Sequence, residues 1–172
     1  MTPSDLSAVV AIADVVHPSY PEDAEVLAER LRLYPHGCHV LAQGGALDGY
    51  VISHPWYDSG APALNSLLHR LPDVPSAFYI HDIALLPAAR GGDAASDIVV
   101  RLADHARAQG FAAMSLVAVG GSAGFWQKHG FAVVEGTAPA AKLASYGGGA
   151  RLMTRRLAGA CIIFLSLLTF NS

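Results

Sequence analysis

The 172-residue sequence has little cysteine and little charge. Its two cysteines, Cys38 and Cys161, are far apart and lack the spacing of metal ligands, which argues against a disulfide framework and a zinc site. We therefore expect no metal and a reducing, cytoplasmic location. Charged residues make up 15% of the chain, the formal net charge is -3, and no dense run of Lys and Arg occurs. A nucleic-acid partner, which requires a basic face, is therefore not expected.

The N-terminus lacks the basic segment followed by an apolar run that marks a secretory signal. A long apolar run occurs at the other end, where Leu157 to Phe170 spans about 14 residues against the ~17 to 25 that a membrane-spanning helix needs. We therefore expect one domain over residues 1–157 and a hydrophobic tail over residues 158–172.

The tail has several interpretations. It could dock on an exposed sheet edge, form a subunit interface in a homodimer, or be an unnatural end produced by a shifted reading frame. Arg151, Arg155 and Arg156, just before it, would also suit a weak contact with a membrane surface. Docking or an interface is favoured, because a soluble protein rarely leaves so large an apolar area exposed.

The hydrophobic content of 52% indicates a folded α/β domain. Apolar residues at helical spacing predict a first helix that ends at His17, because the residue before Pro18 is driven away from helical geometry. The remaining periodicity and the turn residues predict, in order, a helix opened by 21–23, strands at 38–43 and 47–53, a short helix at 63–71, a strand at 78–86, a helix from 94 closed by 110, a strand at 113–119, a short helix at 123–129, and strands at 130–134 and 151–157.

The chain is organised around Tyr79 to Ala106, which predicts a strand, a turn of small residues and an amphipathic helix. A helix that starts directly after a glycine turn leaves backbone N–H groups unpaired at its first turn. Such a helix start binds anions, and a phosphate group is the expected ligand. The strand, helix, strand order that continues to Val119 predicts a parallel crossover.

Two motifs in this region resemble those of the GNAT acyltransferase superfamily. Arg90-Gly91-Gly92-Asp93-Ala94-Ala95 resembles its acetyl-CoA signature, Arg/Gln-x-x-Gly-x-Gly/Ala, after a strand and at the start of a helix. Phe125-Trp126-Gln127-Lys128-His129-Gly130-Phe131 resembles its aromatic-x-x-x-Gly-Phe segment. Because both motifs occur in order, the resemblance is more specific than either motif alone, and it covers roughly residues 8–157.

The resemblance implies a central mixed, mostly antiparallel sheet flanked by helices, splayed between two parallel strands, with the thioester of acetyl-CoA in the cleft. The backbone around the strand end would pair with the pantetheine arm as if the arm were a strand. The turn would hold the pyrophosphate on backbone N–H groups, with Arg90 adding a charged contact. The implied cofactor-binding residues are Ile83, Ala84, Leu85, Leu86, Arg90, Gly91, Gly92, Asp93, Ala94, Ala95, Ser122, Phe125 and Trp126.

Three features depart from the family pattern. Asp93 stands where the signature has a glycine, which places a carboxylate beside the expected phosphates. Trp126 occupies the position of a tyrosine that can protonate the leaving thiolate in many members, and an indole N–H is not a useful acid. The strand that normally precedes the first helix is missing, which would expose a sheet edge.

The catalytic candidates follow from the chemistry of acetyl transfer, because an ammonium acceptor must lose a proton before it attacks. His81 and Asp82 lie just before the cofactor turn, and alternation along a strand predicts that one of them faces the cleft. The alternatives are a structural histidine and a capping or paired aspartate. Tyr146 is the tyrosine best placed to replace the missing acid. Glu22 and Tyr20 resemble acceptor-side positions of the family, although the polarity of a loop explains them equally well.

The sequence therefore predicts an N-acetyltransferase that uses acetyl-CoA as co-substrate. The acceptor would be the amine of a small molecule, or less readily a protein amino group, attacking directly in a ternary complex. The alternative is a catalytically impaired relative that binds an acyl-CoA or another protein, as Asp93 and Trp126 suggest.

Overall fold

The computed structural model describes residues 1–135 and 143–157. The predictions for the tail at 158–172 lie outside the described residues. Within the described part of the chain, no helix is both long enough and apolar enough to cross a membrane.

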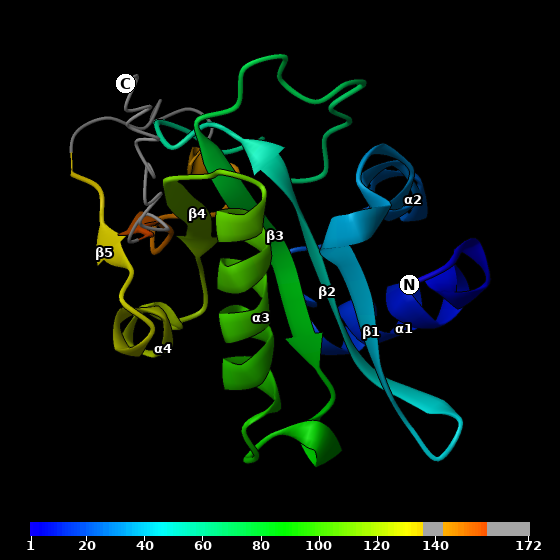
Figure 1. Ribbon diagram of the computed structural model, residues 1–172. Coiled ribbons are helices and arrows are strands. Elements are labelled where there is room, and N and C mark those ends of the chain that lie inside the picture. Colours follow the sequence, from blue (N-terminus) through cyan, green and yellow to red (C-terminus); the bar gives the residue numbers. More distant parts are fainter. Residues whose placement is uncertain (136–142, 158–172) are drawn as a thin grey trace, which may run out of the picture.

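The helices and strands form a single mixed sheet with helices on both faces (Figure 1). In the described residues the sheet order is β1-β2-β3-β4-β6-β5, and only β3 and β4 are parallel neighbours. The elements are α1 (Leu6–Val16), α2 (Ala24–Leu33), β1 (Cys38–Gln43), β2 (Ala46–Trp56), β3 (Ala77–Leu85), α3 (Ala94–Ala108), β4 (Ala113–Ala118), α4 (Ala123–Lys128), β5 (Ala132–Val133) and β6 (Arg151–Arg156), with short 3-10 turns at Pro3–Asp5, Pro35–Gly37 and Pro87–Ala89. This architecture confirms the predicted fold class.

Helices α1 and α2 cover the β1–β2 end of one sheet face. The apolar stripes of the two helices, including Val9, Ile12 and Leu27, pack on Tyr50 and Ile52 of β2. Helix α1 ends at Val16, as Pro18 predicts, and this places His17 at the start of the connection to α2.

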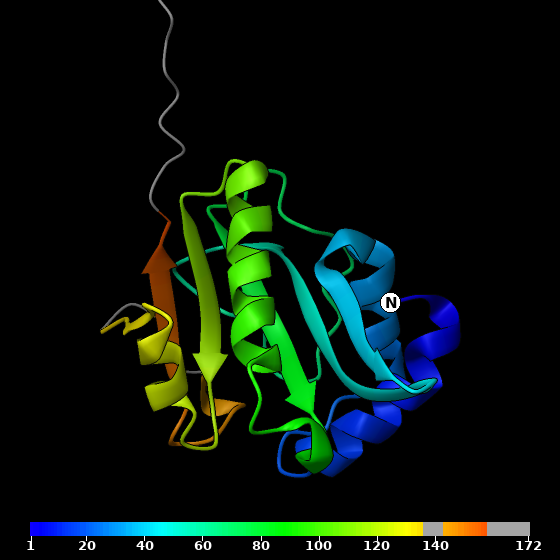
Figure 2. The same cartoon turned by 60° about the horizontal axis from the view of Figure 1, so that its bottom comes forward.

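Helix α3 lies across the opposite face (Figures 1 and 2). Val99 and Leu102 of α3 pack on Phe78 and Ile80 of β3 and on neighbouring residues of β4. Because side chains alternate along β2, Val51 joins this second core while Tyr50 and Ile52 join the first. The sheet is therefore buried on both faces near its centre.

Strands β3 and β4 pair over only three positions, from Phe78 opposite Met114 to Ile80 opposite Leu116. Beyond these pairs β3 continues to Leu85, and within residues 1–135 and 143–157 no strand pairs with it on its β4 side. Figure 2 shows the arrowheads of the two strands apart, on either side of the lower end of α3 in this view. The predicted splay between two parallel strands is thus present.

No strand precedes α1 in the described chain, so β1 forms one edge of the sheet. The N-terminal ammonium group of Met1 donates a hydrogen bond of 3.1 Å to the carbonyl oxygen of Cys38 in this strand.

Two local predictions were wrong. The segment 63–71 is not helical, because the N–H groups of Leu68 and His69 bond the Glu29 carboxylate of α2, at 2.7 and 2.8 Å, instead of helical carbonyls. Asn65 and His69 also have positive φ angles of 51° and 62°. The strand predicted at 130–134 shrinks to Ala132–Val133, since it pairs with β6 at only two positions.

Candidate active site

A pocket of about 710 Å3 opens where β3 and β4 separate. Its walls come from the β3 end, the α1–α2 connection, the β4 end with the start of α4, and the loops that carry Leu64 and Tyr146. Elements far apart in the sequence therefore converge on one cleft, and the parallel strand pair is the feature that opens it.

A β-bulge in β3 shapes the polar wall of the pocket. Ile52 of β2 faces Asp82 while the next residue, Ser53, faces Ile80, so His81 is the extra residue in the ladder. The bulge places His81 and Asp82 on the same sheet face, and both contact the α1–α2 connection. The expectation that only one of them would face the cleft was wrong, because strand alternation fails at a bulge.

His81 forms a buried pair with Glu22. Its Nε2 lies 2.9 Å from Glu22 Oε2, and the two side chains are 1% and 9% exposed. The Nδ1 of His81 is buried and has no hydrogen-bond partner among the described residues. Burial alone would raise the pKa of Glu22, but the adjacent His81 and the backbone N–H of Asn65 outweigh it and lower that pKa.

Asn65 holds the Glu22 segment in place. Its backbone N–H donates to Glu22 Oε1 at 3.1 Å, while its side-chain oxygen accepts the backbone N–H of Asp23 at 2.7 Å. Its side-chain amide donates to the Asp23 carboxylate at 3.1 Å. Asn65, in the non-helical segment 63–71, therefore holds the Glu22 carboxylate in the pocket wall.

Asp82 forms the second carboxylate–histidine pair. One of its oxygens, Oδ1, lies 2.9 Å from Nε2 of His17, and the other accepts a hydrogen bond from the hydroxyl of Tyr50. Burial lowers the pKa of His17, but the adjacent Asp82 carboxylate and the backbone of Ile83 together outweigh it, so the net pKa is raised. His17 is 24% exposed and Asp82 is 14% exposed.

His54 lies behind the His81 pair. The ring centroids of His54 and His81 are 5.9 Å apart, and His54 is fully buried. Its Nδ1 bonds the carbonyl oxygen of Pro55 at 3.0 Å, which requires that nitrogen to carry the proton. Burial, aided by the nearby His81, lowers the pKa of His54 to about 3, so its ring is neutral at physiological pH.

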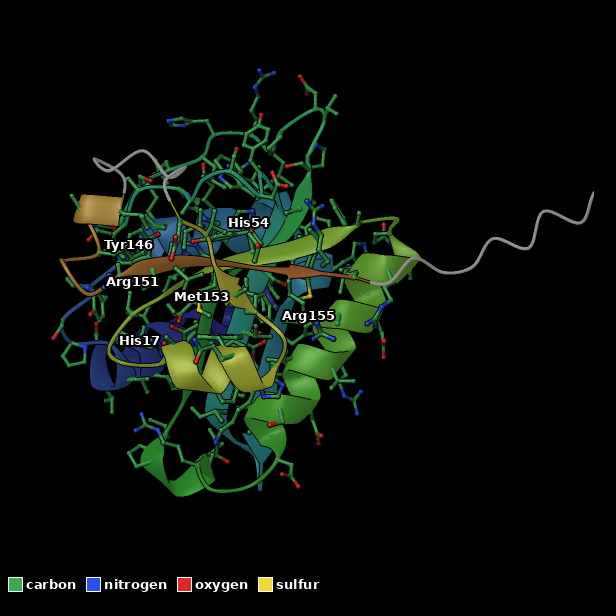
Figure 3. The ribbon with its side chains drawn as sticks, turned by 90° about the vertical axis from the view of Figure 1, so that its left-hand side faces the viewer. His17, His54, Tyr146, Arg151, Met153 and Arg155 are labelled. Atoms are coloured by element: carbon green, nitrogen blue, oxygen red, sulfur yellow. The ribbon has the colours of Figure 1, made fainter. Side chains whose placement is uncertain are left out.

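Tyr146 lines the pocket from the loop before β6. Its hydroxyl donates to the carbonyl oxygen of Pro62 at 3.1 Å and accepts a hydrogen bond from the hydroxyl of Tyr79. Burial raises its pKa to about 12, which keeps the hydroxyl protonated at neutral pH. Figure 3 shows Tyr146 and His17 toward the same end of the molecule as Arg151, the first residue of β6.

The turn after β3 leads directly into the first residues of α3, whose backbone N–H groups can bind an anion. Gly91 has a φ angle of +89°, which favours glycine, and Arg90 donates from Nε to the carbonyl oxygen of Leu85 at 2.9 Å. That bond uses one of the five N–H donors of the guanidinium group. The first N–H of this helix with a helical partner is that of Asp97, which bonds the carbonyl oxygen of Asp93 at 2.7 Å. The N–H groups before it are placed to meet an anion.

Asp93 is the N-cap residue of α3, but its side chain makes no capping hydrogen bond and is exposed. The carboxylate that departs from the family signature is therefore in water rather than buried in the turn. Water and salt screen such a charge strongly.

The structure brings most of the predicted site residues together, though not all of them. Ala84 and Leu86 instead contribute to the core under α1 and α2, Ala94 lines a separate groove, and Gly91, Gly92 and Asp93 form the exposed turn. The predicted residues that line the pocket are His81, Asp82, Ile83, Leu85, Arg90, Ala95, Ser122, Phe125, Trp126 and Tyr146.

Helix α4 supplies the wall opposite β3. Ser122 is its N-cap residue, as predicted, although its side chain makes no capping hydrogen bond. Phe125 is partly buried in the pocket wall, while Trp126 is only 8% exposed and packs edge-on against Phe131 with ring centroids 5.5 Å apart. Trp126 is thus mainly a core residue that reaches the pocket.

Sequence reasoning did not identify His17 and Tyr50 as site residues. The available signal was the His17-Pro18 step, which ends α1 and fixes where the imidazole begins. The contact of both residues with Asp82 depends on tertiary packing.

Comparison with known proteins identifies the family. The family model described as acetyltransferase (GNAT) family matches residues 9–131. The chain belongs to the GNAT acetyltransferase family. A search of curated protein sequences found no match.

Solved structures of GNAT proteins share the fold. The GphF GNAT-like decarboxylase, in complex with isobutyryl-CoA, aligns with a TM-score of 0.76 at 19% identity, covering 92% of this chain and 97% of that one. The ribosomal-protein-S18-alanine N-acetyltransferase from Escherichia coli aligns with a TM-score of 0.64 at 16% identity, covering 93% and 92%. Rv2747 from Mycobacterium tuberculosis, in complex with CoA and NLQ, aligns at 0.65 and 18%, covering 90% and 95%.

Membership in this family makes the protein an acyltransferase, and GNAT neighbours bind CoA or an acyl-CoA. Within the described ranges, no group of three or more His, Cys, Asp and Glu side chains is arranged to hold a metal ion.

Proposed function

We propose that the protein is an N-acetyltransferase that transfers the acetyl group of acetyl-CoA to the amine of a small molecule. The observation that carries the proposal is the continuous path from the open start of α3, through Arg90, to the pocket between β3 and β4. A pyrophosphate at the helix start would place the pantetheine arm along the unpaired edge of β3.

The cofactor arm fits the free edge of β3. Ile83 and Leu85 line the pocket beyond the last pair with β4, so an extended ligand can lie there as a strand would. Arg90 offers further donors beside the strand end. An acyl group carried along this path reaches the pocket wall that contains His81 and Asp82.

The polar wall supports transfer to an amine. An incoming ammonium group would lose its proton to the cluster around the bulge, where we place His81 and Asp82 as the predicted catalytic residues. The neutral amine then attacks the thioester carbon, a C–N bond forms and the C–S bond breaks. Tyr146 remains protonated at neutral pH and is the proposed donor to the leaving thiolate.

The acceptor side is formed by Tyr20, Glu22 and Leu64. The carboxylates of Glu22 and Asp82 make this side suited to a cationic amine. A pocket of this size accommodates a small molecule together with the acetyl group, which is why a small acceptor is preferred over a folded protein.

The test is release of free CoA from acetyl-CoA in the presence of a panel of small amines, with mass spectrometry of the acetylated product. The proposal expects acceptor-dependent CoA release and a product heavier by one acetyl group. If acetyl-CoA does not bind at millimolar concentration, the proposal fails. Binding without turnover of any amine or peptide would favour the impaired acyl-CoA-binding alternative, which Asp93 and Trp126 motivate.

A further inference from the structure

We infer that Glu29 and Arg30, a buried ion pair on α2, are positioning residues for the acceptor: they fix the segment 63–69, which in turn fixes the acceptor side of the pocket. This inference rests on the proposed function and adds to it the element that determines how tightly the amine binds. It follows from the hydrogen bonds that order a segment without regular secondary structure.

The ion pair lies inside the protein. Glu29 is 5% exposed and Arg30 is 1% exposed, and Nη1 of Arg30 lies 2.7 Å from Oε2 of Glu29. Burial raises the pKa of Glu29, but the backbone N–H groups of Leu68 and His69 and the charge of Arg30 together outweigh it and lower that pKa. The Glu29 carboxylate is therefore ionised at neutral pH.

Both charged groups bind the backbone of the segment. The carboxylate of Glu29 accepts hydrogen bonds from the N–H groups of Leu68 and His69 at 2.7 and 2.8 Å. The Nη2 of Arg30 donates to the carbonyl oxygen of Ser66 at 2.6 Å. Hydrogen bonds with an ionised partner are stronger than those between neutral groups. Two adjacent residues of α2 thus hold three backbone groups of one short segment.

The segment has little order of its own. Residues 63–69 form no helix or strand, and Asn65 and His69 have positive φ angles, which are unfavourable for residues other than glycine. Within the segment, the hydroxyl of Ser66 donates to the carbonyl oxygen of Ala63 at 2.6 Å. A backbone conformation of this kind persists only when the surrounding structure holds it.

The segment carries the acceptor side of the pocket. Leu64 lines the pocket, and the next residue, Asn65, donates its backbone N–H to Oε1 of Glu22 at 3.1 Å. The backbone N–H of Leu64 donates to the hydroxyl of Ser145, in the loop before β6, at 3.1 Å. A displacement of the segment would therefore move Leu64 and remove one partner of the Glu22 carboxylate, which is a charge proposed to attract the amine.

The stability of the fold does not explain why this pair is buried. Taking two charges out of water is costly, and replacing such a pair by apolar residues of similar volume is often neutral or stabilising. The Nε of Arg30 adds to the cost, because it is buried and has no hydrogen-bond partner among the described residues. The best-attested role of such pairs is to hold one particular arrangement of neighbouring elements. Here that arrangement is α2 against the segment 63–69.

The test uses a double variant that removes both charges, Glu29→Leu/Arg30→Met. Apolar replacement of a whole buried pair is compatible with folding, and Leu and Met are good helix formers. The matched control is Arg70→Gln/Asp73→Asn, which removes an exposed ion pair, 3.6 Å apart, just beyond the segment. Arg30→Lys is the conservative variant, because lysine keeps the positive charge but lacks the planar fork that binds Glu29 and the Ser66 backbone together.

Three measurements separate a positioning role from a general loss of structure. Circular dichroism and thermal unfolding establish that each variant is folded at the assay temperature. Calorimetry measures acetyl-CoA affinity, and CoA release gives kcat and the KM of the amine with the highest kcat/KM in the panel. Amide hydrogen exchange at Leu68 and His69 reports on their contacts with Glu29 and needs neither substrate.

We expect slow exchange at Leu68 and His69 in the wild type and in the control, and exchange faster by about tenfold or more in the double variant, which lacks their acceptor. The double variant should keep acetyl-CoA affinity within about twofold, while the KM of the amine rises by about 10- to 100-fold, as on loss of a hydrogen bond to a charged group. Its kcat should change less than this KM. Arg30→Lys should raise the KM less, and the control should match the wild type.

Three results would overturn the inference. These are unprotected exchange at Leu68 and His69 in the wild type, an amine KM within about threefold of wild type in the folded double variant, and a loss of acetyl-CoA affinity as large as that of the amine. If the double variant does not fold, an unchanged amine KM in Arg30→Lys overturns the inference instead. A wild type that binds no acetyl-CoA would overturn the proposed function. Because hydrogen exchange needs no substrate, the two failures are distinguishable.

Discussion

The stability of the protein should fall steeply below neutral pH because of His54. This ring is fully buried and its pKa is lowered to about 3 by burial and by the nearby His81, whereas an unfolded histidine titrates near its ordinary value of 6.5. Below pH 6.5 the unfolded chain therefore binds a proton that the folded chain does not. The stabilising contribution is complete above that pH and is lost progressively as the pH falls toward about 3.

The size of the effect follows from proton linkage. One extra proton bound by the unfolded state gives a slope of about 1.4 kcal/mol per pH unit. Between pH 6.5 and pH 4.5, His54 alone should therefore reduce the free energy of unfolding by about 2.5 kcal/mol. Burial also lowers the pKa values of His39, His105 and His129, which act in the same direction, while the raised pKa of His17 opposes them.

The contribution of His54 is measured as the difference in free energy of unfolding between the wild type and a variant that lacks this imidazole. Urea unfolding is measured from pH 4.5 to pH 7.5 for the wild type and for His54→Gln, whose amide can still donate to the Pro55 carbonyl but does not titrate. The stability gap between the two proteins should narrow by about 2.5 kcal/mol over the two units below pH 6.5. A His69→Asn control at an exposed position should show no such change. A gap that stays constant with pH would show that folding does not lower the pKa of His54.

Three further predictions concern the cofactor turn, the sheet and the pocket loop. Asp93→Gly should tighten acetyl-CoA binding by roughly several-fold in calorimetry, because it removes an exposed negative charge beside the expected phosphates; unchanged or weaker affinity would show that the turn does not bind them. Gly37→Ala should lower the free energy of unfolding by about 1 to 3 kcal/mol, because a Cβ there would overlap the backbone oxygen of Ser53; urea unfolding within error of wild type would contradict this. Asn65→Ala should be less stable than Asn65→Gly by about 1 kcal/mol, because the residue has a positive φ angle; equal midpoints at equal m-values would argue against that strain.

Features set by local sequence were predictable. Pro18 ends α1, the glycine-rich turn joins β3 to α3, and the apolar stripe of α3 marks the face that packs on the sheet. Each of these depends on residues within a few positions of one another. The GNAT motifs then supplied the type of sheet, which is mixed and splayed between two parallel strands, and the position of the cofactor turn.

Features set by contacts between distant residues were not predictable. The bulge at His81 exists because β2 and β3 change register, which no local pattern announces, and it reversed the expected placement of His81 and Asp82. The segment 63–71 has apolar residues at spacings that fit a helix. Its N–H groups at Leu68 and His69 instead donate hydrogen bonds to the Glu29 carboxylate. His17 belongs to the site because it contacts Asp82, and the position of Asp82 depends on the bulge. The pairing of His81 with Glu22 and of Asp82 with His17 could therefore not be predicted without the assembled sheet.

We propose that acetyl-CoA binds along the free edge of β3 with its pyrophosphate at the start of α3. Titration of the 15N-labelled protein with acetyl-CoA, followed by amide chemical shifts, tests it most directly. We expect saturable shifts concentrated at Ile83 to Leu85 and Arg90 to Ser96, with smaller changes at the edge strand β1. Absence of shifts at millimolar acetyl-CoA, or shifts confined to residues outside the pocket, would contradict it.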